Sequence, residues 1–270
     1  MNLSKRLEEA RQAFLKKKNA KASLWIQDPN QIALAMEKHG SLSSQFIGNM
    51  VYGGLDGIIS IFAVVSGVAG AQLSAGVLLI LGAANLLGDG FSMGVGAFLS
   101  MKSEKEYYDQ EYQRESAEVE NNPEVEKKEL EGIYLKQGYP PDDAKKMIEI
   151  KTKDKSLWLK AMMIEELGLT KDERKPTSAA LITFGSFVGF GLLPLLIYVI
   201  DLVFKTHLSP TTLFIIAILL SALSLFSLGA AKVFITQRSP VRSGLEMLIV
   251  GGLAAGVAYF VGLLLKPLGG

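Results

Sequence analysis

The chain has 270 residues, in which 28 Lys and Arg nearly balance 27 Asp and Glu, but these charges are strongly segregated. Residues 1–45 hold eight basic and four acidic side chains, residues 101–177 hold fifteen and nineteen, and the other 148 residues hold only five and four. With no Cys and only two His, a disulfide framework and a zinc or copper site built on thiolates and imidazoles are excluded. Long glycine-rich apolar segments without strand-like alternation indicate helices in lipid.

The first 45 residues are basic and lack the apolar stretch and small-residue cleavage site of a secretory signal peptide. Their apolar residues form a loosely amphipathic pattern that is interrupted at Asp28-Pro29. Two interpretations stay open. The segment is either a basic amphipathic helix on the anionic inner face of a membrane or a solvated leader that only follows the positive-inside bias.

Five apolar segments are each long enough to cross about 30 Å of hydrocarbon, and they predict an all-α membrane protein with five transmembrane helices. The expected helices cover residues 46–70, 75–101, 178–203, 211–236 and 244–265. Small residues recur four apart on several of them, which predicts close helix packing within one chain or across a dimer. Pro194 lies inside the third span and predicts a kink.

These segments divide the chain into four expected parts. They are a basic cytoplasmic segment (1–45), transmembrane helices 1 and 2 (46–101), a cytoplasmic acidic helical domain that binds metal (102–177), and transmembrane helices 3 to 5 (178–270).

Basic residues near the ends of the spans predict the orientation. The N-terminal segment, the 102–177 insert and the last connection (Lys232, Arg238 and Arg242) are rich in Lys and Arg, whereas the first and third connections hold only Lys205. The N-terminus and the insert are then cytoplasmic and the C-terminus is extracytoplasmic, in the cell membrane if the protein is prokaryotic.

Two carboxylates lie deep inside the expected spans. Asp56 is in the first span and Asp89 is in the second, where an ionised group is costly unless it meets water, a cation or another polar group. Asn85, Asp89 and Met93 are spaced by four residues and form one stripe on an otherwise apolar helix. The Asp89 carboxylate has two interpretations, a functional ligand and a group hydrogen-bonded by a closely packed neighbouring helix. Next to oxygen donors the Met93 thioether is a candidate soft ligand.

The insert is expected to form short helices over residues 102–120, 125–137, 142–150 and 155–167. Its candidate ligands share helix faces at spacings of three or four, and they are Glu111, Glu115 and Glu118, then Glu126 and Glu129, then Met162, Met163 and Glu166. Acidic helices in water are commonly just solvated faces, but carboxylates that converge from several helices are also how carboxylate metal sites are built. Trp158 and the two methionines equally suit an apolar seam.

Several motifs, in this order, resemble those of the vacuolar iron transporter family. They are YGGLDGIISIFAVVSG, ANLLGDGFSMGVGAFLS followed by SEKEYYDQEYQRE, EVEKKELEGIYLKQG, and MMIEELGL. The similarity extends from about residue 48 to the end, and we expect a prokaryotic-type member. It implies five transmembrane helices, a homodimer with the metal path at the two-fold interface, and proton-coupled export of Fe²⁺, often also of Mn²⁺, from the cytosol.

The same resemblance assigns roles to individual residues. Asp56 matches the acidic residue of the first helix in the path, and Met93 matches the methionine of the second helix. The cytoplasmic metal-binding positions match Glu115, Glu118, Glu126, Glu129, Met162, Met163 and Glu166. Plant members can carry a glutamate two turns before the path methionine, where this chain has Asn85. Because an amide side chain does not take up or release a proton at physiological pH, proton coupling then depends more on Asp56, together with Asp89.

We therefore expect a homodimeric divalent-metal/proton antiporter without a prosthetic group or enzymatic activity. The insert captures Fe²⁺ or Mn²⁺, and the path runs past Asp56, Asn85, Asp89 and Met93. A mixture of carboxylate and thioether ligands suits a borderline ion such as Fe²⁺. The expected partners are divalent ions, protons, membrane lipid and a second copy, and no nucleic acid.

Two alternatives stay in view. One is a metal-binding membrane channel or scaffold without coupled transport. The other is a membrane-tethered diiron oxidase, which is disfavoured because such sites use a Glu-x-x-His pattern and residues 101–177 contain no His.

Overall fold

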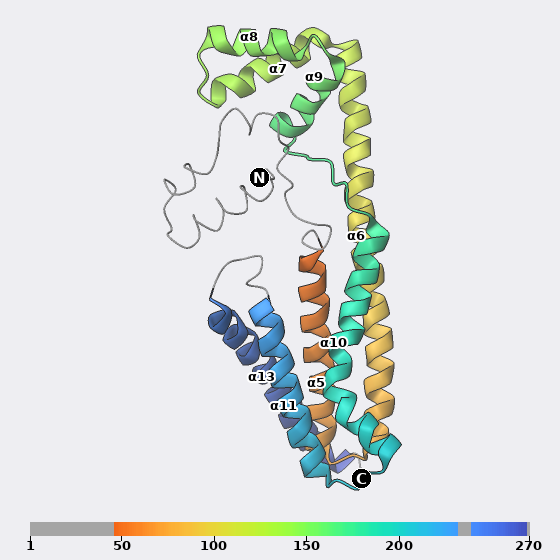
Figure 1. Cartoon of the computed structure of the whole chain (residues 1–270). Coiled ribbons are helices and arrows are strands. Elements are labelled where there is room, and N and C mark those ends of the chain that lie inside the picture. Colours follow the sequence, from red (N-terminus) through yellow and green to blue (C-terminus); the bar gives the residue numbers. More distant parts are fainter. Residues whose placement is uncertain (1–45, 232–238, 269–270) are drawn as a thin grey trace, which may run out of the picture. The chain divides into compact units, whose positions relative to one another are not determined.

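The computed structural model describes residues 46–231 and 239–268, and over these residues it is entirely helical (Figure 1). Five of the described helices are long and apolar enough to cross a membrane: α5 (Ile47–Ala71), α6 (Ala75–Asn121), α10 (Pro176–Phe204), α11 (Pro210–Ala231) and α13 (Pro240–Leu265). The predicted fold class is confirmed. The basic segment 1–45 lies outside the described residues, as do Lys232 and Arg238 of the last connection.

Proline marks the beginning of several helices. Pro176, Pro210 and Pro240 each open a membrane-spanning helix, and Pro123 and Pro141 open α7 and α8 of the insert. A proline suits the first helical position because the N–H that it lacks has no partner in the first turn. The sequence analysis began these spans at later residues, because it counted only the apolar stretch and not the first turn before it.

Helix α6 is unbroken over 47 residues, so it is about 70 Å long, more than twice the thickness of the hydrocarbon layer. Its first turn is capped by the hydroxyl of Ser74, which accepts a hydrogen bond from the backbone N–H of Val77 at 3.4 Å. The helix ends at Asn121, directly before Pro123 opens α7. The predicted span 75–101 and the predicted acidic helix 102–120 are therefore two halves of one rod.

The membrane-spanning helices pack through apolar side chains and glycines. Helix α6 packs along α10, and α11 packs along α13 (Figure 1). One buried cluster draws residues from all five helices, including Val65, Leu86, Phe187, Ala217 and Ala255. Pro194 is buried within α10, which continues as one helix on both sides of it.

The small-residue pairs behave in two ways. Gly53 and Gly57 of α5 lie against the backbone of α10, where a Cβ atom would collide with Thr183 and Phe187. The pairs Gly185/Gly189 and Gly252/Gly256 have open space at the position of a Cβ atom. Only part of the predicted close packing is therefore used within one chain.

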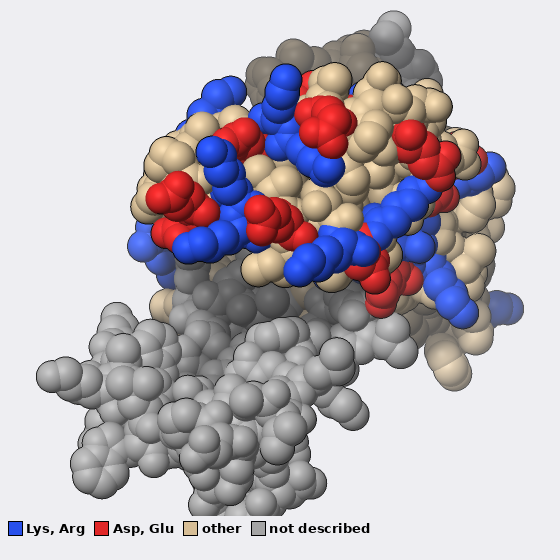
Figure 2. Space-filling model, turned by 90° about the horizontal axis from the view of Figure 1, so that it is seen from above, with Lys and Arg blue, Asp and Glu red and all other residues tan. Residues whose placement is uncertain are grey.

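The insert has its own apolar core. It comprises α7 (Pro123–Lys136), α8 (Pro141–Lys151), α9 (Lys155–Ala161) and a π-helical turn, η1 (Met162–Glu166). Buried side chains from these elements and from α6 form one cluster, with Val119, Leu130, Tyr134, Ile148, Trp158 and Met162 among them. Outside this core, basic and acidic side chains are interspersed over the face seen in Figure 2. Trp158 and Met162 are therefore both part of this apolar core.

The π-helical turn departs from the single helix expected over residues 155–167. The backbone N–H of Leu167 donates to the carbonyl of Met162, five residues earlier, at 3.2 Å. A π-turn accommodates one residue more than an α-turn, and such turns are frequent at functional sites. Here it coincides with two adjacent, fully buried side chains, Met162 and Met163.

Substituting Gly262 with alanine is expected to destabilise the membrane domain, because a Cβ atom there would overlap the backbone of Gly67 on α5. Overpacking of this kind costs about 1 to 3 kcal/mol. The matched control is Gly256→Ala on the same helix, where the added Cβ meets open space. The melting temperature of the purified protein in detergent should fall for Gly262→Ala and be unchanged or higher for Gly256→Ala. Equal melting temperatures would contradict this packing.

Candidate metal centre

Five glutamates from three elements form a carboxylate cluster in the insert. Two come from α6, two from α7 and one from η1: Glu115, Glu118, Glu126, Glu129 and Glu166. They make two triads, Glu115/Glu118/Glu126 and Glu126/Glu129/Glu166, in each of which one carboxylate oxygen per residue lies within 4.8 Å of the others. Glu126 belongs to both triads. We call these five residues the carboxylate cluster.

Local sequence explains why these side chains converge. The spacing of three residues places Glu115 and Glu118 on one face of α6, and Glu126 and Glu129 on one face of α7. The break at Asn122 ends α6 and begins α7, and α6, α7 and η1 contact one another. A multi-helix carboxylate arrangement is the geometry in which helical proteins hold divalent metals.

Two members of the cluster are buried without adequate partners. Glu115 is 1% exposed and Glu126 is 4% exposed. Among the described residues, both oxygens of Glu115 and Oε2 of Glu126 accept no hydrogen bond. An ion-pairing nitrogen, Nη2 of Arg114, lies 2.7 Å from Oε1 of Glu115, but it lacks hydrogen-bond alignment. Buried carboxylates without such partners are costly, and a bound cation would supply what they lack.

The surroundings raise the pKa of several cluster carboxylates. Burial, followed by the negative charge of Glu166, raises the pKa of Glu115 to about 7, although Arg114 opposes this shift. Burial and the charge of Glu129 also raise the pKa of Glu126 and of Glu166. In the absence of a cation Glu115 therefore holds its proton up to near neutral pH, and a metal ion that binds there has to displace it.

The two predicted methionine ligands are fully buried in the π-helical turn. Met162 is a member of the apolar core of the insert. Glu166 is the last residue of the same turn, and it is the residue that the turn contributes to the carboxylate cluster. The turn thus contributes one residue to the apolar core and another to the carboxylate cluster, and its two methionines carry thioethers, which are soft ligands.

The four predicted path residues lie on two neighbouring helices. Asp56 is partly buried on α5, and Asp89 of α6 is near enough to act on its carboxylate electrostatically. Along α6, Asn85 and Met93 are partly buried, whereas Asp89 is exposed on the surface of the single chain. The predicted stripe exists, but its central carboxylate faces outward.

Of these four residues, Met93 lines one of the pockets that the described residues form. This open pocket of about 420 Å³ lies between α5, α6 and α10. Polar groups also line it, among them Ser100 and the pair Asn49 and Thr183, in which Nδ2 of Asn49 donates to Oγ1 of Thr183 at 3.1 Å. Asn49 and Thr183 were not among the predicted path residues, although their polarity within apolar segments was a usable signal.

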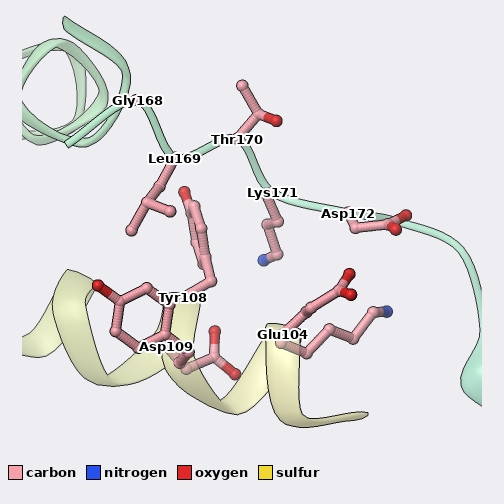
Figure 3. Close-up of a pocket in the computed structure, with 10 residues that line it drawn as sticks. Glu104, Tyr108, Asp109, Gly168, Leu169, Thr170, Lys171 and Asp172 are labelled. Atoms are coloured by element: carbon pink, nitrogen blue, oxygen red, sulfur yellow. The ribbon is translucent and has the colours of Figure 1, made fainter. Parts of the chain in front are cut away.

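A second pocket, of about 410 Å³, lies between α6 and the linker 168–172 (Figure 3). Lys171 points from the linker toward α6, where Glu104 lies, and Thr170 points away from the helix. The lining includes Tyr108 and Asp109 but none of the predicted ligands. Charges of both signs make this pocket a poor match for a cation site.

Arg114 is the residue of the cluster region that the sequence analysis missed. Its guanidinium donates to Glu111 at 2.9 Å and to Glu118 at 2.8 Å, in addition to its contact with Glu115. The signal was present, because spacings of three and four residues place Glu111 and Glu118 within reach of Arg114 on one helix. Glu111 therefore contacts this arginine and belongs to neither triad.

Comparison with known proteins identifies the chain's relatives. A model of the VIT family matches residues 47–263. The chain belongs to the VIT family. It is 42% identical to the vacuolar iron transporter of Toxoplasma gondii over 85% of this chain and 78% of that protein. It is 35% identical to the vacuolar iron transporter of Plasmodium falciparum, over 86% and 87%, and 31% identical to vacuolar iron transporter 1 of Arabidopsis thaliana, over 83% and 87%.

Membership confirms the resemblance that the motifs indicated. A chain of the VIT family with five apolar helices is a multi-pass membrane transporter and not an enzyme, so the tethered diiron oxidase is excluded. The relatives named here are eukaryotic, and they give no support to the expectation of a prokaryotic-type member.

The metal-free protein is expected to lose stability as pH rises from about 4.5 to 7, because the folded state holds a proton on Glu115 that the unfolded chain releases. Glu115→Gln should flatten this dependence, since the amide resembles the protonated carboxyl. Melting temperatures of chelator-treated protein between pH 5 and 8 test the expectation. Glu124→Gln is the control, because Glu124 is exposed and its pKa is lowered by Lys127. Parallel curves for Glu115→Gln and the unsubstituted protein would contradict the assignment.

Proposed function

We propose that the protein moves Fe²⁺ or Mn²⁺ out of the cytosol, and that the carboxylate cluster captures the ion. The observation that carries this proposal is Glu115, which is buried with both carboxylate oxygens lacking hydrogen bonds among the described residues, inside a cluster of five carboxylates. The names of the relatives, which all refer to iron, support metal-ion transport.

The donor set suits divalent ions of intermediate softness. Carboxylates favour hard cations such as Mn²⁺, and thioethers favour softer ones, so the combination with Met162 and Met163 favours Fe²⁺ over Mg²⁺ or Cu⁺. Two triads that share Glu126 offer room for more than one ion. Several carboxylates together supply the negative charge that a divalent ion needs when it gives up its water.

The proposed capture site and the proposed translocation path are two separate sites that share one helix, α6. Met93 precedes Glu115 by 22 residues on the same helix, a separation of about 33 Å along its axis. The ion must therefore leave the cluster before it reaches the membrane path. The pocket that contains Met93, with the polar groups of Asn49, Ser100 and Thr183, is the proposed entrance to that path.

A second copy of the chain is the proposed cover for the outward face of α6. Around this helix Asp89 lies on one side of Gly88, and Leu87 and Phe91 lie on the other. All three side chains are exposed, and Gly88 leaves open space for a close approach. A carboxylate facing hydrocarbon at this depth is costly unless water, a cation or another polar group meets it. A homodimer with the metal path at its interface meets this requirement.

Proton antiport is the proposed driving force. Asp56 and Asp89 are the carboxylates that lie deep in the spans and interact electrostatically, whereas Asn85 cannot carry a proton. Metal binding between such groups releases protons, and protonation on the acidic side of the membrane releases the metal. The other two membrane carboxylates have local partners: Asp201 accepts from Thr206, and Glu246 pairs with Arg242 at 3.4 Å.

Asp56→Asn is expected to slow metal uptake into proteoliposomes on the order of tenfold or more, because the amide removes both a ligand charge and the proton site. The measurement is the initial rate of Fe²⁺ and Mn²⁺ entry with an acidic interior. Asp201→Asn is the matched control and should retain the rate. Native rates for Asp56→Asn would refute the proposed path, and flux that ignores the pH gradient would favour a channel.

The proposed orientation places the N-terminus and residues 102–177 in the cytoplasm and the C-terminus outside. Five spans put the insert and the C-terminus on opposite sides of the membrane. A reporter that is active only outside the cytoplasm should work at the C-terminus, and it should be silent in the turn at Gly138 between α7 and α8. If instead the reporter worked at Gly138 and was silent at the C-terminus, the topology would be the inverse of the proposed one, and the cluster could not capture metal from the cytosol.

A further inference from the structure

Arg114 uses every nitrogen of its guanidinium on carboxylates of its own helix. Nε lies 2.9 Å from Oε2 of Glu111, Nη1 lies 2.8 Å from Oε2 of Glu118, and Nη2 lies 2.7 Å from Oε1 of Glu115. Its side chain is 43% exposed, so the group lies at the rim of the carboxylate cluster. A guanidinium is charged at every physiological pH, and its planar fork suits such multiple contacts.

Two of these three partners are proposed metal ligands. Glu115 and Glu118 belong to the first triad, whereas Glu111 belongs to neither triad. A divalent ion in this triad needs the same carboxylate charge that Arg114 already shares. The ion and the guanidinium repel each other, so binding of one weakens the hold of the other. Glu111 remains available as a partner for Arg114 when Glu115 and Glu118 coordinate the ion.

Other cations of the insert have partners outside the triads. Lys127 pairs with Glu124 at 2.7 Å, Lys151 pairs with Glu165, and Lys155 pairs with Glu120. Within the part of the chain that the structure describes, every ion pair to a triad carboxylate comes from Arg114. One guanidinium thus pairs with two of the five cluster carboxylates and balances only part of the charge of the cluster.

We propose that Arg114 is a built-in counter-ion of the capture site, which competes with the metal for Glu115 and Glu118 and thereby keeps the affinity low enough for release. This inference rests on the proposed capture of metal by the cluster. Arg114 acts through the ligands and touches no metal, so it is a positioning residue. A transported ion has to leave its capture site, and a resident cation that returns to the carboxylates assists that step.

A purely structural role for Arg114 makes the opposite prediction. If the arginine only holds the ligands in place, its removal loosens the site and weakens metal binding. If it competes with the metal, its removal strengthens metal binding although the metal-free protein becomes less stable. The direction of the change in affinity therefore separates the two roles.

The test measures Mn²⁺ binding to the full chain in detergent at pH 8, by competition with a fluorescent chelator. Arg114→Gln should bind Mn²⁺ about tenfold more tightly than the unsubstituted protein, because a repelling unit charge next to the ion is gone. Arg114→Lys keeps the charge and should stay close to the unsubstituted affinity. Lys102→Gln is the matched control, because it removes an exposed charge of the same helix that pairs with Glu106 at 3.5 Å; we expect a change of less than about twofold.

Melting temperatures with and without Mn²⁺ provide the second measurement. Arg114→Gln should melt below the unsubstituted protein without metal, and Mn²⁺ should raise its melting temperature by more, as tighter binding requires. Equal or weaker binding by Arg114→Gln, with normal binding by the unsubstituted protein, overturns the role of Arg114 and leaves the capture site standing. Absence of Mn²⁺ binding by the unsubstituted protein overturns both proposals.

Discussion

The unbroken backbone of α6 is the constraint on which the other parts depend. An α-helix satisfies its own backbone hydrogen bonds, so it can leave hydrocarbon and continue into water without a break. Helix α10 packs along α6, and α7 and η1 contact it in the insert. Because one rigid element carries both Met93 and Glu115, the sequence sets the axial spacing between these two residues of the proposed path and the proposed capture site.

The cost of isolated charge governs both halves of this helix. In the membrane half, Asp89 is exposed on the surface of the single chain, where a carboxylate facing hydrocarbon requires a polar partner. In the polar half, Glu115 is buried and balanced only in part by Arg114. In the proposed transporter, a second copy of the chain stabilises the first carboxylate and a divalent cation stabilises the second. A transport protein needs carboxylates of this kind, because a carboxylate that a permanent partner already neutralises gains little free energy from binding a metal ion.

The sequence predicted the five spans and the helices of the insert well, since apolar length and proline breaks are local signals. It also contained the family motifs and the shared faces of Glu115/Glu118 and Glu126/Glu129. The π-helical turn was not predictable, because an i to i+5 hydrogen bond is selected by how Met162 and Met163 bury and not by local propensity. Convergence of Glu166 with α7, and the outward direction of Asp89, likewise depend on tertiary packing that spacing does not reveal. Arg114 was overlooked although its spacing was informative.

The length of α6 beyond the membrane also makes it a lever. From Met101 to Glu120 the helix extends about 28 Å, so a tilt of about 5° around Met101 displaces its far end by about 2.5 Å. That displacement matches the length of a single metal–oxygen bond, about 2.0 to 2.6 Å. Because the helix is one rod, a tilt of its apolar half is transmitted to the end that carries Glu115 and Glu118, with no hinge in between to absorb it.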